Sequence, residues 1–220
     1  MSIIIIGSGR CGTSYLAKTL MNNGYKGDKW GKAEDKRMRR INEKLLEQFQ
    51  AVNHSSKPYG ILPDKEIIIE NAKESYLERM AIKKENIILK DPRTTILHRY
   101  WLPNKYIAIY RHPNEVVLSY IKEMKEYFDD YYTAYDTFME YWLRFNKSVL
   151  FCLYNYPGGI LLKYDHTIDD QLRKLFNHLG IKNPKLIQDT RTITDENEIK
   201  DTRAKEMYNQ LNEKQANQWK

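Results

Sequence analysis

The sequence predicts an α/β fold, a three-layer sandwich in which helices cover both faces of a central parallel sheet. Two observations lead to this prediction. Short apolar segments of strand length alternate with longer amphipathic segments along the chain, which is the order expected for parallel strands joined by crossover helices. The 220 residues contain no low-complexity tract, internal repeat or credible linker, so residues 1–220 are expected to form a single domain with a substantial core.

Apolar runs and turn residues define the expected elements. The isoleucines of residues 3–6 make a strand, Pro113 suits the first position of a helix, and Gly180 ends a later helix. Loops with Gly and Pro at 58–60 and 157–159 separate elements. In chain order the expected elements are strand 2–6, helix 13–23, helix 34–50, helix 64–82, strand 86–90, strand 105–110, helix 113–127, helix 133–155, strand 159–164, helix 168–179 and helix 203–218. Ligands of such a sheet bind at the carboxyl ends of its strands.

The segment from Gly7 to Ser14 is a glycine-rich turn between the first strand and the first helix. Backbone N–H groups converge in such a turn, and the helix N-terminus adds unpaired donors, so a phosphate or sulfate fits there. The spacing matches the dinucleotide fingerprint G-x-G-x-x-G. Asp28 lies at about the distance of the acidic residue that binds ribose, but the apolar strand that should precede it is missing. The P-loop frame G-x-x-x-x-G-K-[ST] also fits, except that Thr13 occupies the position of the lysine that reaches the β- and γ-phosphates. With Arg10 as its cation, the turn suits a reaction other than γ-phosphoryl transfer.

A second anion site is predicted at the end of strand 105–110. Arg111 directly follows this strand, and Ser119 lies eight positions further on, off the apolar stripe of the next helix. A guanidinium at a strand end offers a two-pronged hydrogen-bond fork to a phosphate. The alternative is that Arg111 is a surface arginine and Ser119 a solvated helix serine.

The two motifs together resemble those of sulfotransferases that use 3′-phosphoadenosine 5′-phosphosulfate (PAPS). The family's 5′-phosphosulfate loop is similar to the run Gly9, Arg10, Cys11, Gly12, Thr13 and Ser14. The resemblance implies a P-loop nucleotide-binding fold in which Arg10 meets the bridging and sulfonate oxygens and the Gly-Thr-Ser segment holds the 5′-phosphate. As the S–O bond breaks, negative charge builds on the leaving phosphate, and a fixed guanidinium stabilises that charge.

Two further segments extend the resemblance. Arg111, Glu115 and Ser119 fit the family's 3′-phosphate clamp, written R-x-P-x-[DE]-x-x-x-S. Residues 159–180 resemble the late strand–helix segment of these enzymes, which implies that Tyr164 lies near the adenine. The alternative for Tyr164 is a tyrosine of the core or its rim.

The general base is the least defined part of the expected site. An acceptor hydroxyl has a high pKa, so a carboxylate or imidazole that takes its proton assists attack on sulfur. Cytosolic small-molecule members of the family carry K-x-H, whereas Pro92 stands in place of that histidine here. Carbohydrate- and tyrosine-acting members place a glutamate after the P-loop helix, and Asp28 holds a comparable position. We therefore expect Asp28 to act as the base, with Glu34, Asp35 and Asp91 as the alternatives.

Lys90 ends an apolar strand, and it is expected either to contact the sulfonate or to form a salt bridge with a neighbour. The net charge of +7 and a pI near 9.1 suit a polyanionic nucleotide. The sequence has no aromatic stacking motif and no pattern of a nucleic-acid-binding fold, so nucleic acid is not an expected partner.

The rest of the composition narrows the class of protein. Two cysteines imply no disulfide framework, and the histidines have no metal-ligand spacing. Four isoleucines before the loop are too short a run for a signal peptide or membrane anchor. We expect a cytoplasmic, metal-independent sulfotransferase that moves a sulfonate group from PAPS to a hydroxyl of a glycan or other small polar acceptor. The alternatives are a P-loop nucleoside or nucleotide kinase, with Asp91 organising magnesium, and a non-catalytic nucleotide-binding module.

Overall fold

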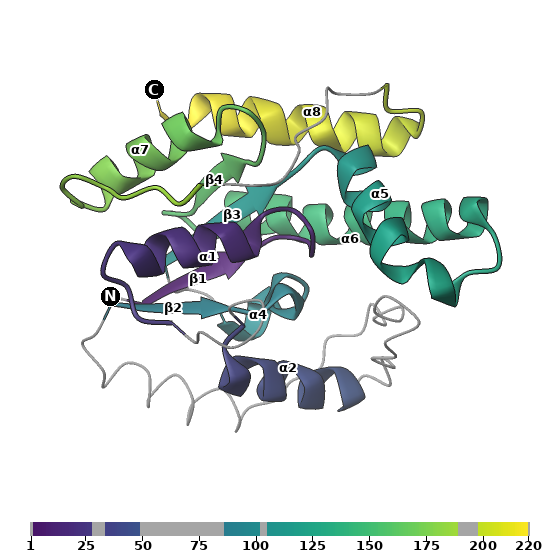
Figure 1. Ribbon diagram of the computed structural model, residues 1–220, viewed down its shortest axis with the longest axis horizontal. Helices are drawn as coiled ribbons and strands as arrows, with labels where there is room; N and C mark the ends of the chain where they lie inside the picture. Colours follow the sequence, from purple (N-terminus) through teal and green to yellow (C-terminus); the bar gives the residue numbers. More distant parts are fainter. Residues whose placement is uncertain (1, 28–33, 49–85, 102–104, 189–197, 220) are drawn as a thin grey trace.

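The computed structural model describes residues 2–27, 34–48, 86–101, 105–188 and 198–219. Its strands are β1 (Ser2–Ile6), β2 (Ile87–Lys90), β3 (Lys105–Tyr110) and β4 (Ile160–Lys163). Its helices are α1 (Thr13–Asn22), α2 (Lys36–Gln48), α4 (His98–Trp101), α5 (Pro113–Met124), α6 (Tyr131–Asn155), α7 (Ile168–His178) and α8 (Thr202–Asn217), with 3₁₀ turns η1 (Pro92–Thr95) and η2 (Lys125–Tyr127). The expected α/β architecture around a parallel sheet is confirmed (Figure 1).

The sheet has the strand order β2-β1-β3-β4, and its pairings are parallel. In the register of the sheet, Ile4 of β1 lies between Leu89 of β2 and Tyr106 of β3. The chain passes from β1 to β2 on one side and then crosses to β3 on the other side, so the strand order reverses at β1. Open α/β sheets bind ligands at the carboxyl end of such a reversal point. Residues 7–12 follow β1 directly and therefore lie at this place.

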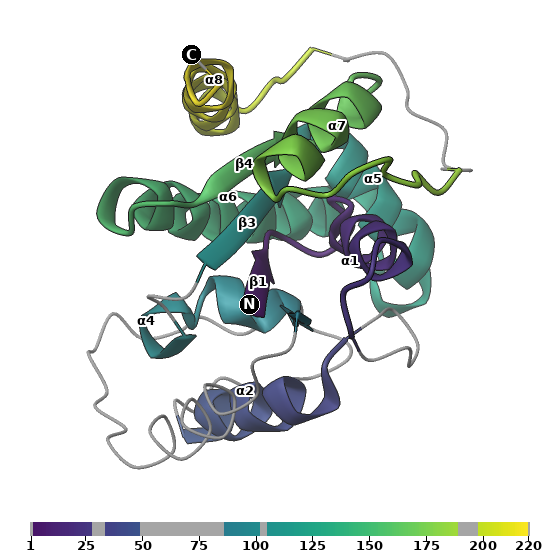
Figure 2. The same ribbon diagram turned by 90° about the vertical axis from the view of Figure 1, so that its left-hand side faces the viewer.

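Helices cover both faces of the sheet. Helices α1 and α7 lie on one face, while α6 and α8, which pack on each other, lie on the other (Figure 1, Figure 2). Helix α5 packs along α6 and lies at the end of the sheet toward which the strand arrows point (Figure 1). The loop after β1 and the start of α5 are thus brought to the same edge.

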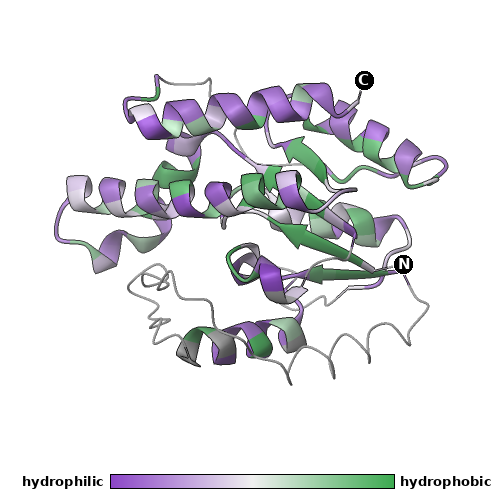
Figure 3. Ribbon diagram, turned by 180° about the vertical axis from the view of Figure 1, so that it is seen from behind, coloured by the Kyte–Doolittle hydropathy of each residue, from purple (hydrophilic) through white to green (hydrophobic). Residues whose placement is uncertain are grey.

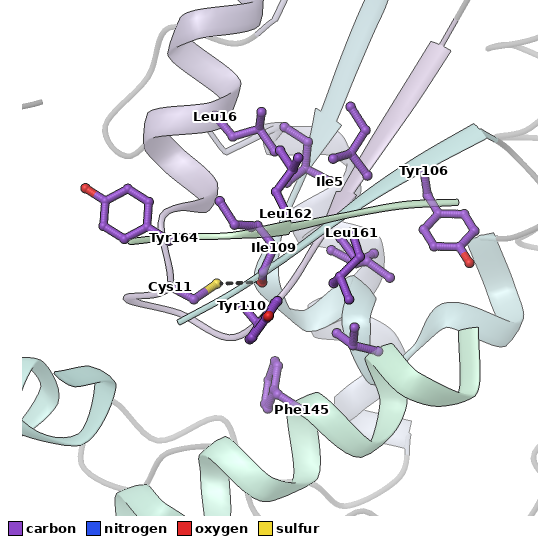
Figure 4. Close-up of a cluster of buried hydrophobic side chains, with 14 of the residues drawn as sticks. Ile5, Cys11, Leu16, Tyr106, Ile109, Tyr110, Phe145, Leu161, Leu162 and Tyr164 are labelled. Atoms are coloured by element: carbon purple, nitrogen blue, oxygen red, sulfur yellow. Dashed lines mark hydrogen bonds between the residues drawn. The ribbon is translucent and has the colours of Figure 1, made fainter. Parts of the chain in front are cut away.

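The strands form the apolar centre of the molecule. Residues Ile3–Ile6 of β1 are at most 1% exposed, as expected for a strand covered on both faces. Figure 4 shows Leu16 of α1 and Phe145 of α6 on opposite sides of the strands. Figure 3 shows that the strands are hydrophobic, whereas the helices carry hydrophilic residues along much of their length. Across the described helices, none combines the length and apolarity needed to cross a membrane.

Most expected elements agree with the observed ones to within three residues at either end. The expected helix 64–82 lies outside the described residues. The turn η1 and the short helix α4 were not predicted, because four residues give too little periodicity to detect. The sequence nevertheless carried a helix-start signal, because Asp91 is followed by Pro92 as the first residue of the turn. In the structure the Asp91 carboxylate accepts a hydrogen bond from the Arg93 N–H at 2.8 Å.

The outer edge of β4 is closed by two glutamine side chains. The Gln171 amide of α7 accepts from the Lys163 N–H at 2.8 Å and donates to the Lys163 carbonyl at 2.9 Å. Gln218, which follows α8, pairs in the same way with the N–H and carbonyl of Leu161. Backbone groups of β4 are thus paired even though no further strand follows β4 in the described sheet.

Candidate functional site

Two hydroxyl groups hold the loop that joins β1 to α1. The Thr95 hydroxyl of η1 accepts from the Gly7 N–H at 2.8 Å and donates to the Gly7 carbonyl at 3.0 Å. The Tyr141 hydroxyl of α6 accepts from the Gly9 N–H at 3.1 Å. A Cβ atom at Gly9 would lie 1.9 Å from the Tyr120 hydroxyl, so any other residue here would require the Tyr120 side chain to shift. The Gly7 and Gly9 N–H groups thus have protein partners, and these contacts fix the first part of the loop.

The loop turns sharply where it enters α1. Arg10 and Gly12 have positive φ angles of 65° and 103°, and a left-handed conformation at a non-glycine residue costs roughly 1–2 kcal/mol. The Leu16 N–H donates to the Gly12 carbonyl in the first backbone hydrogen bond of the helix, so the loop joins α1 at the end toward which helix N–H groups point. This geometry fits the oxyanion cradle that the sequence predicts.

Cys11 points away from the cradle and fastens the loop to β3. Its thiol donates to the carbonyl oxygens of Ser8 and Ile109 at 2.7 and 3.1 Å, and Figure 4 shows the second of these contacts. Burial raises the pKa of the Cys11 thiol to about 11, so the thiol stays protonated and unreactive at neutral pH. Cys11 therefore offers only backbone groups to a ligand of the loop.

Arg10 extends from the loop to α5. Its Nε donates to the Ser119 hydroxyl at 2.9 Å, and its Nη1 lies 2.9 Å from a carboxylate oxygen of Glu123. Spacing in the sequence groups Ser119 with Arg111, but in the structure its hydroxyl contacts Arg10. Ser119 and Glu123 lie one helical turn apart, so one face of α5 orients the guanidinium. Both members of the ion pair are partly exposed, Arg10 by 33% and Glu123 by 39%.

Lys90 brings a second cation to the first turn of α1. Its Nζ donates to the Ser14 hydroxyl at 3.2 Å and lies 3.4 Å from Oε1 of Glu34. The Lys90 side chain is buried. Burial lowers the pKa of its amine, and the nearby Glu34 carboxylate acts in the opposite direction. The salt bridge that was one of the two expectations for Lys90 is therefore present, formed with Glu34 beside the cradle.

The four candidate bases differ in what their carboxylates contact. Asp28 lies outside the described residues. Asp35 caps α2 by accepting from the Met38 N–H at 2.8 Å. Asp91 is buried with its two oxygens on the backbone and guanidinium of Arg93; burial raises its pKa, and the guanidinium counteracts this. The Asp35 and Asp91 carboxylates therefore serve as caps, whereas the Glu34 carboxylate pairs with Lys90 and lies 3.8 Å from Nη1 of Arg39.

Arg111 is buried at the end of β3. Its Nε donates to the Glu115 carboxylate at 2.8 Å. Its guanidinium lies over the ring of Tyr164, 5.3 Å from the centroid, which is within the range of a cation–π interaction. The Trp142 indole N–H donates to the Arg111 carbonyl at 3.0 Å. Both the backbone and the side chain of this arginine are thus fixed.

Tyr164 packs within the core beside Arg111 and the end of the loop at Gly12. It is 1% exposed, and its ring meets that of Tyr15 edge to face. A Cβ atom at Gly12 would lie 2.6 Å from the Tyr164 ring, so this tyrosine supports the entry of the loop into α1. The observed packing agrees with the core alternative, while a contact with adenine stays a prediction.

The structure therefore brings Arg10, Ser14, Lys90 and Arg111 to one edge of the sheet. It adds Glu123 and Thr95, which the sequence reasoning missed. Glu123 continues the four-residue repeat of Glu115 and Ser119, and this repeat was a usable signal. In the ranges that the structure describes, no group of three His, Cys, Asp or Glu side chains is placed to hold a metal ion.

Comparison with solved structures relates this architecture to sulfotransferase domains. The chain is similar to the sulfotransferase domain from the curacin biosynthetic pathway, with a TM-score of 0.50 and 15% identity, over 86% of this chain and 77% of that one. It is also similar to the sulfotransferase domain from the Synechococcus PCC 7002 olefin synthase, with a TM-score of 0.53 and 17% identity, over 82% of this chain and 72% of that one. No family model and no curated protein matches the sequence. The resemblance to sulfotransferases is thus confirmed at the level of the fold.

Proposed function

We propose that this protein is a PAPS-dependent sulfotransferase that transfers a sulfonate group to a hydroxyl acceptor. The observation that supports this most is that one helix joins two arginine sites: Arg10 and Arg111 both contact α5. A nucleotide with both 5′ and 3′ phosphates needs two separate cationic sites. The α5 partners Glu115 and Glu123 are eight residues apart, which is about 12 Å along a helix axis.

The residues around the loop are suited to stabilise charge on a leaving phosphate. When bound, the donor would supply the sulfonate group and the phosphate from which it departs. Arg10 belongs to the loop, and Lys90 contacts the first turn of α1, so both cations adjoin the cradle. Fixed cations stabilise developing negative charge with little reorganisation. Arg111 would hold a phosphate that does not react, so its contribution would be to binding.

We assign the role of general base to Glu34 among the described candidates. Its carboxylate pairs with Lys90, which adjoins the cradle, and with Arg39, while those of Asp35 and Asp91 are engaged in caps. A carboxylate in this place would take the proton of the acceptor hydroxyl as the bond to sulfur forms. Asp28 is kept as the second candidate on the sequence argument.

The same contacts disfavour the kinase alternative. Phosphoryl transfer in P-loop enzymes depends on a loop lysine and on an acidic residue that organises magnesium. Thr13 replaces that lysine, and the Asp91 carboxylate is bound to Arg93. We propose further that the enzyme acts in the cytoplasm on a glycan or small polar acceptor. The net charge of +7 would attract an acidic acceptor as well as the nucleotide.

Calorimetric titration tests the proposed donor. We expect 3′-phosphoadenosine 5′-phosphate to bind at least about tenfold tighter than 5′-AMP or ATP without magnesium, a difference of about 1.4 kcal/mol for the added charged hydrogen bonds. Equal affinities, or ATP binding that requires magnesium, would favour the kinase instead. Nucleotide binding without sulfonate transfer to any hydroxyl acceptor would indicate the non-catalytic module.

A further inference from the structure

One face of α5 carries an acidic partner for each of the two arginines. Glu115, Ser119 and Glu123 follow one another at intervals of four residues, so they lie along one side of the helix. Glu115 pairs with Arg111 at 2.8 Å and Glu123 pairs with Arg10 at 2.9 Å. An anion that binds at either arginine therefore meets a carboxylate already in place.

The two carboxylates differ in how readily they can give up their arginine. The Glu115 pair is buried, and separating it would leave an uncompensated charge in the core. The Glu123 pair is partly exposed, so water can solvate either group when the pair opens. Ser119 holds the Arg10 Nε at 2.9 Å, so Arg10 keeps one fixed contact while its Nη1 exchanges partners.

The reaction changes the charge that Arg10 faces. In the donor, the 5′-phosphate and the sulfonate share an oxygen as a mixed anhydride; transfer breaks the S–O bond, and the phosphate keeps that oxygen as one more ionisable terminal oxygen. A guanidinium that stabilises this charge as it develops also binds the product tightly. A nearby carboxylate that competes for the same guanidinium weakens product binding.

We propose that Glu123 competes with the 5′-phosphate of the nucleotide product for Arg10 and thereby speeds product release. This inference rests on the proposed function. It assigns to Glu123 a role on the product side of the reaction, distinct from the buried and fixed Glu115. The effect is electrostatic and occurs at a partly exposed site, so it should diminish as ionic strength rises.

Binding and dissociation of 3′-phosphoadenosine 5′-phosphate test the proposal in wild type and in Glu123→Gln. We expect the variant to bind roughly three- to tenfold tighter at low salt, mainly through slower dissociation. Glu126→Gln is the matched control, because Glu126 is exposed on η2 just beyond α5 and makes the same charge change. It should bind as wild type does.

An Arg10→Ala background shows whether the effect passes through Arg10. In that background, Glu123→Gln should raise the affinity for 3′-phosphoadenosine 5′-phosphate no more than Glu126→Gln does. Unchanged or weaker product binding in Glu123→Gln, or a gain that persists without Arg10, would overturn the proposal.

Inorganic pyrophosphate, titrated in parallel, separates the two levels of inference. If wild type binds no nucleotide but Glu123→Gln tightens pyrophosphate binding through Arg10, the proposed function and the role in product release are wrong, and only competition between Glu123 and a phosphate anion for Arg10 stands. If neither titrant responds to the loss of Glu123, the competition is wrong.

Discussion

Arg10 and Arg111 mark the two ends of the proposed site, and the protein holds them differently. Each pairs with a glutamate of α5 at nearly the same distance, 2.9 Å for Arg10 and 2.8 Å for Arg111. The Arg10 pair is partly exposed, and Arg10 is a loop residue with a left-handed backbone conformation. The Arg111 pair is buried, with the guanidinium resting on Tyr164.

This difference in burial separates anchoring from chemistry. A buried pair stays fixed, because opening it would leave a charge without solvent or partner. An exposed pair contributes little to stability and can exchange partners with a ligand. We infer that the Arg111 end anchors the nucleotide and that the Arg10 end, with Lys90, faces the charge that changes during the reaction.

The largest effect is expected from removal of the general base, which acts only at the Arg10 end of the site. Glu34→Gln is expected to lower the transfer rate by roughly 10²–10⁴-fold while nucleotide affinity stays near that of wild type. Asp35→Asn makes the same charge change one residue away, and asparagine still caps a helix, so it should retain activity. Steady-state kinetics with calorimetry makes the comparison. If Glu34→Gln is fully active and Asp28→Asn is not, the base is Asp28.

Loss of an α5 carboxylate should destabilise the two ends unequally. Glu115→Ala leaves Arg111 buried without its carboxylate and should cost about 3–5 kcal/mol in the free energy of unfolding. Glu123→Ala removes a partly exposed partner and should cost no more than about 1 kcal/mol. Urea denaturation measures both. Similar losses in the two variants would remove the distinction between a fixed and an exchangeable pair.

Loss of each arginine should change different kinetic constants. Arg111→Ala is expected to raise the KM for the donor roughly 10- to 100-fold, the range expected for lost hydrogen bonds to a charged group. Arg10→Ala should lower kcat more than it changes KM, because its contact strengthens as charge develops. Arg111→Lys, which keeps a cation beside Glu115, controls for misfolding. Equal increases in KM with unchanged kcat would remove the catalytic role of Arg10.

The smallest effect is expected from pH, through the residues that support the Arg10 loop. His98 Nδ1 lies 3.0 Å from the Thr95 carbonyl, and Thr95 holds Gly7. Burial lowers the pKa of His98 below its ordinary value of 6.5. As the pH falls through this value, the unfolded chain binds the proton first, so stability decreases toward acid.

A single substitution isolates this contribution. His98→Phe keeps an aromatic ring beside Phe151, which lies 5.1 Å away by ring centroids, and removes the titrating group. Its Tm should fall less than that of wild type between about pH 7.5 and about pH 5.5. An equal fall in both proteins would mean that His98 does not titrate on unfolding.

Local patterns were sufficient to predict the strands, the loop and the position of Arg111. The apolar runs of β1 and β3 identify two strands, and parallel topology brings Gly7–Ser14 and Arg111 to the same edge. The contacts within the site could not be predicted in this way. Arg10 meets a serine 109 residues away, and this contact depends on how α5 packs beside the loop. Spacing alone therefore linked Ser119 to the arginine nearer in sequence.

The candidate bases differ from Arg10 in this respect. Asp35 and Asp91 were ranked with Glu34 as carboxylates near the expected site, although a local signal separated them. Their cap hydrogen bonds, to Met38 and Arg93, single them out as structural. Both caps involve neighbours two or three residues along the chain, so cap patterns were the usable signal.

The glutamine side chains on β4 have a consequence for synthesis of the chain. Gln171 follows its partner Lys163 by eight residues, but Gln218 follows Leu161 by 57 residues. On the ribosome, half of this strand edge therefore stays open while the intervening residues are made. An open edge can pair with a strand of another nascent chain. Gln218, just after α8, supplies the second amide and closes this part of the edge.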